Sequence, residues 1–294
     1  MKYILTIIIG FILIIGFLVY QGIYLPLDNS GEVVRFLVNK GDTARDVAEN
    51  LKNDDLIRYE TAFRVYASLT DKADKLVIGE YELSSSMNIP EIINKLSSGD
   101  RLKRMITIIE GWDIKDIKEY LEKQGIEGDI DPSLEGYLFP DTYELSLEDK
   151  MDDVVQMMTD NFDDKVGEVS SNDLIMASLL EKEVITLEDK KIVSGILWKR
   201  LVEEMPLQVD ATITYLTGKS KVSLDDLEID SPYNTYKYKG LPIGPICNPG
   251  LESIKAARNP MDSEYWFYLS TSEGETIFSK SFKEHQQAIE KYLK

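Results

Sequence analysis

The stretch Ala177-Ser178-Leu179-Leu180-Glu181-Lys182-Glu183-Val184 sets the interpretation of this chain, because it combines an apolar helical pattern with acidic side chains. We expect a helix over residues 173–184. At about 100° per residue, the apolar positions Ile175, Met176, Leu179 and Leu180 form one stripe, and Glu183 projects close to the centre of that stripe. Glu181 projects nearly opposite, which leaves it at most a supporting or solvent-facing role.

The position of Glu183 allows two interpretations. A carboxylate on an apolar face is desolvated, which raises its pKa above the value of about 4.3 of a free Glu and favours the protonated form near neutral pH. A general acid needs that protonation state. Alternatively, Glu183 is a residue at a helix end, solvated or paired with a nearby Lys or Arg, and the stripe alone favours this simpler alternative.

The composition of the whole chain limits the kinds of chemistry that it can carry out. The chain has 294 residues, 33 of them basic and 52 acidic, for a net charge of −19, so binding of nucleic acid or of an anionic lipid surface through a broad basic patch is not expected. Cys247 is the only cysteine and His285 the only histidine. These counts exclude an intramolecular disulfide, a His/Cys-rich zinc site and catalysis by two imidazoles. We predict no metal and no cofactor, and we expect Cys247 to be a small buried hydrophobe.

The N-terminus contains a long uncharged segment over residues 4–20. With the weakly polar residues that follow, it is long enough to cross a bilayer. The alternatives are a cleaved signal peptide, for which no small-x-small site follows before Ala44, and burial in a soluble core. We therefore predict a transmembrane anchor over residues 1–27, a single-pass location in the cell membrane, and a catalytic domain on the extracytoplasmic side.

Beyond a polar linker at 28–32, the pattern predicts a mixed α+β fold. Strands are expected at 33–38 and 77–83, and helices at 44–51, 60–68 and 90–99. This order resembles the LysM-like glycan-binding modules in outline, with a spacer domain as the alternative. The predicted fold class is thus α+β, and its parts are an N-terminal transmembrane helix (1–27), a small LysM-like α+β module (33–100), a connecting strand-helix subdomain (101–134) and a larger α+β catalytic domain (135–294).

Aromatic and polar side chains gather in the segment Glu135-Gly-Tyr-Leu-Phe-Pro-Asp-Thr-Tyr143. Tyr137, Phe139 and Tyr143 surround Pro140 and the polar residue Asp141, a composition suited to stacking on sugar rings while hydroxyls are hydrogen-bonded. A small aromatic core is the alternative. We list these four side chains as candidate substrate contacts.

Two further clusters could form the wall of a cleft. Leu207 to Thr212 supplies Gln208 and Asp210, and the loops 231–236 and 240–250 combine Gly and Pro with amides and phenols. The candidate substrate contacts here are Gln208, Asp210, Tyr233, Asn234, Tyr236 and Asn248. For Gln208, Asn248 and the three residues from 231–236, a loop-bracing hydrogen bond is the alternative to contact with substrate.

In their order and spacing, these motifs resemble the endolytic murein transglycosylases, the MltG or YceG-like family. The resemblance covers essentially the whole chain. It rests on Glu135 to Tyr143, Ala177 to Glu183, Gln208 to Thr212, Tyr233 to Tyr236 and Gly240 to Gly250. The chain departs from the family pattern at Ala211, where Pro is usual, and at Gln286, where Asn is frequent.

The resemblance implies cleavage of the β-1,4 bond between N-acetylmuramic acid and N-acetylglucosamine in nascent peptidoglycan, leaving 1,6-anhydro ends. It implies that Glu183 is the catalytic acid, in agreement with the helical stripe. The partners would be peptidoglycan strands and membrane peptidoglycan synthases. Two alternatives stay open: a hydrolytic muramidase in which Asp210 or Asp141 is the second carboxylate, and a non-catalytic glycan-binding scaffold of the cell-wall synthesis machinery.

Overall fold

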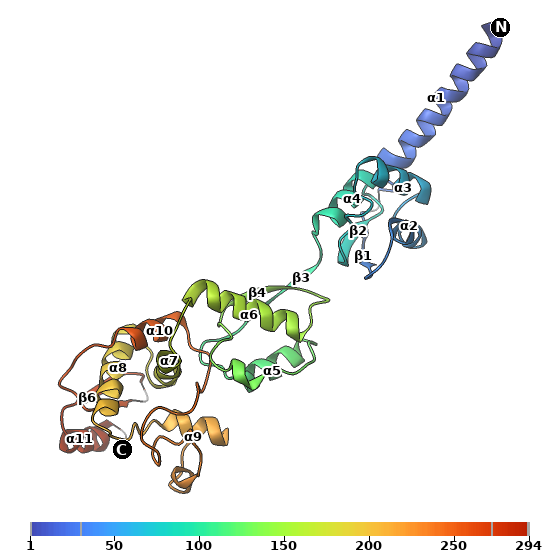
Figure 1. The fold of residues 1–294 in the computed structure, drawn as a ribbon. Coiled ribbons are helices and arrows are strands. Elements are labelled where there is room, and N and C mark those ends of the chain that lie inside the picture. Colours follow the sequence, from blue (N-terminus) through green and yellow to red (C-terminus); the bar gives the residue numbers. More distant parts are fainter. Residues whose placement is uncertain (1, 30, 272, 293–294) are drawn as a thin grey trace. The chain divides into compact units, whose positions relative to one another are not determined.

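The computed structural model describes residues 2–29, 31–271 and 273–292. The chain divides into unit 1, Met1–Arg104 with Glu144–Glu148, and unit 2, Met105–Tyr143 with Asp149–Lys294. Helices and three two-stranded sheets make up these units, which confirms the predicted α+β class (Figure 1). The four-part domain division stays a prediction.

Unit 1 is a small helical layer beside one sheet. Strands β1 and β2 pair antiparallel, with Val33 opposite Ser84 and Val38 opposite Gly79. Helix α2 begins where expected because Thr43 and Asp46 form a capping box, and Asn88 and Glu91 do the same for α4. The elements are α1 (Lys2–Tyr24), β1 (Val33–Val38), α2 (Ala44–Asn53), α3 (Glu60–Leu69), β2 (Gly79–Ser84) and α4 (Ile89–Ser98).

The end of α1 packs into this unit. Ile23 is buried, and the Tyr24 ring lies 6.2 Å from the ring of Tyr66 on α3. In the part of the chain that the structure describes, no helix combines the length and the apolar character needed to cross a membrane.

Unit 2 contains the remaining helices and the β5–β6 hairpin, in which Phe267 lies opposite Ser279. The division between the units runs through β3 and β4, which pair in a sheet of their own. The elements are β3 (Lys103–Thr107), α5 (Ile114–Lys123), β4 (Thr142–Ser146), α6 (Met151–Val166), α7 (Ser171–Glu183), α8 (Leu187–Val202), α9 (Asp210–Thr217), α10 (Leu251–Arg258), β5 (Phe267–Ser270), β6 (Thr276–Ser279) and α11 (Phe282–Tyr292), with short 3₁₀ helices at Pro132–Leu134 and Asp225–Glu228.

Helix α7 is the central helix of unit 2. Its N-cap Ser170 accepts the backbone N–H of Asp173, and it packs against α8, α9 and α10 (Figure 1). Every residue from Leu174 to Leu180 is buried, including Ala177 and Ser178 on the side opposite the predicted stripe. The four residues of the predicted stripe are therefore buried, and neighbours also enclose the opposite side of α7.

The segment that leads from α10 to β5 lies directly on α8. A Cβ on Gly195 would be 2.0 Å from the Met261 carbonyl oxygen, so only glycine fits there. The Met261 N–H also donates to the Lys191 carbonyl at 2.9 Å. At the end of β5, the Ser270 hydroxyl donates to the Glu183 carbonyl at 2.9 Å. The hairpin is thereby fixed at the C-terminal end of α7.

Candidate active site

A cleft of about 520 Å³ opens in unit 2 at the C-terminal end of α7. This volume lies within the range of small-molecule sites. Side chains from α7, α8, α9, β5, α11 and the loop before α10 contribute to it. The lining residues are Lys182, Glu183, Arg200, Gln208, Asp210, Tyr236, Phe267, Tyr268, Leu269, Ser270, Phe282, His285 and Ile289.

Glu183 is the last residue of α7 and is half-buried in this cleft. Burial raises the pKa of its carboxyl to about 7, and the negative charge of Asp210 acts in the same direction. The Tyr268 hydroxyl and the Ala211 backbone N–H, which are hydrogen-bond donors facing this carboxyl, and the charge of Arg200 lower its pKa but do not offset burial. Near neutral pH, Glu183 is therefore populated both as an acid and as a base.

Asp210 and Tyr236 form a polar pair beside Glu183. The Tyr236 hydroxyl donates to the Asp210 carboxylate, and burial together with this contact raises the pKa of Tyr236. Gln208 has a left-handed backbone with a φ of 54°, unusual for a residue that carries a side chain. Its N–H donates to the Thr235 carbonyl at 3.2 Å. Three of the predicted substrate contacts, Gln208, Asp210 and Tyr236, are thus brought together with Glu183.

Among the lining residues that the sequence did not single out for the site are Arg200, Tyr268, Ser270 and His285. Arg200 lies at the i+4 position from Ile196, an apolar residue that is buried on the same helix, and this spacing is a signal that could have identified it. His285 stacks on Phe267 with ring centroids 5.3 Å apart, and burial lowers the pKa of its imidazole. Nothing local in the sequence identifies Tyr268 or Ser270.

Glu181 does not face solvent. Its carboxylate pairs with Lys190 at 3.2 Å, with both side chains less than a tenth exposed. It also accepts the Gly250 N–H at 2.9 Å and the Ser253 hydroxyl at 2.6 Å, at the start of α10. Glu181 has the supporting role, and the solvent-facing alternative is wrong because the helix is enclosed on that side as well.

The aromatic segment lies outside the cleft lining. Phe139 and Tyr143 are buried, and the Tyr137 ring packs on Phe162 with centroids 5.3 Å apart. Asp141 pairs with Lys165, whose hydrogen bond lowers the pKa of Asp141 to about 2. These contacts favour the alternative of a small aromatic core for Tyr137, Phe139, Asp141 and Tyr143. Their contact with substrate stays an untested prediction.

Asn248 is fully buried and braces the chain. Its carbonyl oxygen accepts the N–H groups of Gly136 and Leu138, both at 2.9 Å. Its amide nitrogen donates to the Trp112 carbonyl at 3.1 Å and to Glu135 at 3.2 Å. With these donors and acceptors engaged, loop bracing is what the geometry favours for Asn248.

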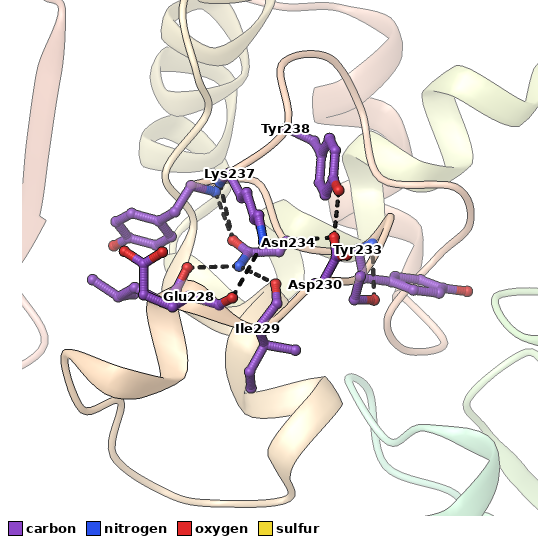
Figure 2. A network of polar contacts seen from close by, with 10 residues as sticks. Glu228, Ile229, Asp230, Tyr233, Asn234, Lys237 and Tyr238 are labelled. Atoms are coloured by element: carbon purple, nitrogen blue, oxygen red, sulfur yellow. Dashed lines mark hydrogen bonds and ion pairs between the residues drawn. The ribbon is translucent and has the colours of Figure 1, made fainter.

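Asn234 is also fully buried. Its amide nitrogen donates to the carbonyls of Leu227 and Ile229, both at 2.8 Å, and its oxygen accepts the N–H groups of Tyr236 and Lys237 (Figure 2). The ring of the preceding residue, Tyr233, packs on Tyr215 with centroids 5.1 Å apart. These hydrogen bonds fix the conformation of the loop that carries Tyr236, which lines the cleft.

Glu135 is a second carboxyl with a perturbed pKa. Burial raises the pKa of Glu135 to about 7, although the Ile114 N–H donates to it at 3.2 Å and the Tyr215 hydroxyl at 3.4 Å. Glu135 does not line the cleft and joins α5, α9 and Asn248. Among the described residues, no cluster of three His, Cys, Asp or Glu side chains is arranged to hold a metal ion.

Comparisons with known proteins agree on one family. The profile of the YceG-like family matches residues 36–291. An endolytic murein transglycosylase from Bacillus subtilis is 34% identical over 96% of this chain and 91% of its own length. An endolytic murein transglycosylase from Streptococcus pneumoniae serotype 2 is 26% identical over 95% of this chain and 62% of its own length. The crystal structure of a YceG-like protein from Listeria monocytogenes matches with a TM-score of 0.56 and 29% identity, covering 88% of this chain and all of that one.

Proposed function

Because this chain belongs to the YceG-like family, we propose that it is a lytic transglycosylase that cleaves peptidoglycan. The single observation in the structure that best supports this function is Glu183, a carboxyl whose pKa is raised to about 7 inside a cleft that can hold sugar units. A lytic transglycosylase needs one group that first donates and then accepts a proton. A carboxyl that titrates near neutral pH meets that need.

The proposed reaction cleaves the β-1,4 bond between N-acetylmuramic acid and N-acetylglucosamine within nascent strands. Glu183 gives its proton to the glycosidic oxygen, the bond from that oxygen to C1 of the muramic acid breaks, and N-acetylglucosamine leaves with a hydroxyl group. The C6 hydroxyl of the same muramic acid then forms a bond to C1 and returns its proton to Glu183. Because this nucleophile is intramolecular, its effective molarity replaces a second carboxylate.

The cleft supports a division of roles around this acid. Gln208 and Asp210 are exposed on one side of Glu183, and Tyr236 is oriented by its hydrogen bond to Asp210. We assign these three side chains to binding of the sugar and its N-acetyl group. Arg200 and Tyr268 face Glu183 itself and affect its carboxylate form.

We also propose that residues 1–27 anchor the enzyme in the cell membrane, with the catalytic domain on the extracytoplasmic side. The support is the uncharged run 4–20 and the exposure of large apolar side chains on α1, including Phe11, Leu13 and Phe17. The strand-helix-helix-strand order of unit 1 supports a LysM-like module. Membrane peptidoglycan synthases are the proposed partners.

The test is mass analysis of the products that the full-length chain releases from purified glycan strands. We expect internal cleavage with 1,6-anhydro ends, and complete loss of products for Glu183→Gln in a protein that stays folded. Products with reducing ends would instead identify a hydrolytic muramidase, with Asp210 as the carboxylate placed to assist. Binding of strands without turnover would identify a scaffold, and either outcome contradicts the proposal.

A further inference from the structure

Arg200 is the most deeply buried charged residue that lines the cleft, with 6% of its surface exposed. Its Nε and one terminal nitrogen donate to the Trp266 carbonyl at 3.0 and 2.7 Å, and the other terminal nitrogen donates to the Leu207 carbonyl at 2.8 Å. The guanidinium also lies 5.2 Å from the centre of the Phe267 ring. Burying the Arg200 charge costs free energy, which its hydrogen bonds must offset. A residue kept at this cost beside the acid is a candidate for a role in the site.

The two carbonyls belong to the segments that supply opposite sides of the cleft. Leu207 directly precedes Gln208, whose left-handed backbone leads into Asp210. Trp266 directly precedes β5, which carries Tyr268 and Ser270 against the end of α7. One guanidinium therefore joins two chain segments that are almost 60 residues apart in sequence.

We propose that Arg200 is a positioning residue: by holding the carbonyls of Leu207 and Trp266, it fixes β5 so that the Tyr268 hydroxyl faces the Glu183 carboxylate in the cleft and can donate to it. The inference rests on the proposed transglycosylase function and extends it to a residue that touches no sugar. Its purpose is chemical, since the hydrogen bond stabilises the carboxylate form that Glu183 adopts after it has protonated the leaving oxygen.

Binding both carbonyls at once requires the planar guanidinium of an arginine. Five N–H donors in one plane can satisfy two carbonyls from different directions, whereas a lysine ammonium is a compact point charge on a flexible stem. Arg200→Lys keeps the positive charge near Glu183 but loses the simultaneous hold on both segments. The variant thus separates the geometric effect of Arg200 from its charge.

The groups that face Glu183 determine the direction in which its pKa changes when one of them is lost. These are Arg200 on α8, Asp210 and the Ala211 N–H on α9, Tyr268 on β5, Tyr236, Lys182 on α7 and His285 on α11. A hydrogen bond to a carboxylate favours the charged form, so its loss raises the pKa. Glu183 must be protonated to act as an acid, and kcat/KM therefore falls as pH rises through its pKa. Losing the Tyr268 hydrogen bond moves that fall to higher pH.

The experiment measures kcat and KM of the full-length chain on purified glycan strands between pH 5 and 9. We expect Arg200→Lys to lower kcat about tenfold, to leave KM within about threefold, and to move the alkaline fall in kcat/KM up by about one pH unit. Tyr268→Phe should move the fall in the same direction. The double variant should move it no further than the larger single change, because Arg200 acts through Tyr268.

Arg258→Lys is the matched control, since Arg258 also donates to two backbone carbonyls, those of Val166 and Glu168, but does not line the cleft. It should leave the pH profile unchanged. An unshifted profile for Tyr268→Phe overturns the proposal even if Arg200→Lys fails to fold. Additive shifts in the double variant, or a changed KM with an unchanged profile in Arg200→Lys, overturn it too. If the wild-type chain releases no anhydro products, the proposed function fails instead.

Discussion

Replacing Glu183 by Gln should make unit 2 more stable at alkaline pH, because the ionised acid is costly to keep in the cleft. Its pKa is raised from 4.5 to about 7 on folding, so protonation is favoured in the folded state. The resulting loss of stability begins as pH rises above 4.5 and is complete above pH about 7. At about 1.4 kcal/mol per unit, the cost is on the order of 3 kcal/mol at pH 8. Gln keeps the shape of the side chain and an oxygen acceptor but cannot ionise.

The assay is urea unfolding followed by tryptophan fluorescence, at pH 5 and at pH 8. The three tryptophans, Trp112, Trp198 and Trp266, all lie in unit 2, so the signal reports on that unit alone. We expect the wild type and Glu183→Gln to differ by less than about 1 kcal/mol at pH 5, and the variant to be more stable by up to about 3 kcal/mol at pH 8. Equal differences at the two pH values would refute burial as the cause of the raised pKa.

Glu181→Gln is the matched control, two residues away on the same helix. It leaves the buried Lys190 ammonium without its carboxylate, and it should destabilise unit 2 by about 3–5 kcal/mol at both pH values. The two neighbouring Glu residues should therefore change stability in opposite directions at pH 8. A variant of Glu181 that is as stable as the wild type would contradict the supporting role assigned to it.

Four further outcomes can be measured. For the wild type, kcat/KM on glycan strands should fall above pH about 7 as Glu183 ionises, and a plateau that extends to pH 9 would argue against Glu183 as the acid. Gln208→Gly should raise the free energy of unfolding by about 1 kcal/mol relative to Gln208→Ala, because only glycine relieves the backbone at φ 54°; equal melting temperatures would speak against strain. Asn248→Ala should cost at least about 2 kcal/mol in urea unfolding, since two buried N–H groups lose their acceptor. Gly195→Ala should lower the melting temperature, because its Cβ would lie 2.0 Å from the Met261 oxygen, and an unchanged melting temperature would contradict that close approach.

The sequence predicts helix boundaries in this chain well where a single capping residue sets the start of the helix. The helix predicted at 44–51 begins at Ala44, where Thr43 caps it, and the helix predicted at 173–184 is observed as Ser171–Glu183. The resemblance to the YceG-like family, which rests on several motifs in order, is confirmed by the family profile and the curated relatives.

What the sequence could not predict depends on contacts between distant segments. The helical period identifies the stripe of α7, but the burial of its opposite side follows from the packing of α8, α9 and α10, which no local period encodes. The partners of Glu183 lie far along the chain, with Tyr268 on a short strand that has no alternating pattern of its own. The side-chain amides of Asn248 and Asn234 could bind a sugar. Only the fold shows that these amides are hydrogen-bonded to backbone groups instead.

The β5–β6 hairpin and α11 place one wall of the cleft in the last 30 residues of the chain. Tyr268, Ser270 and His285 reach Glu183 from residues that a ribosome adds long after the acid itself. A chain interrupted between Glu183 and Phe267 contains the acid but lacks the β5 and α11 residues that line its cleft. The cleft around Glu183 can therefore form only after β5 and α11 have been synthesised, well after the helix that carries the acid.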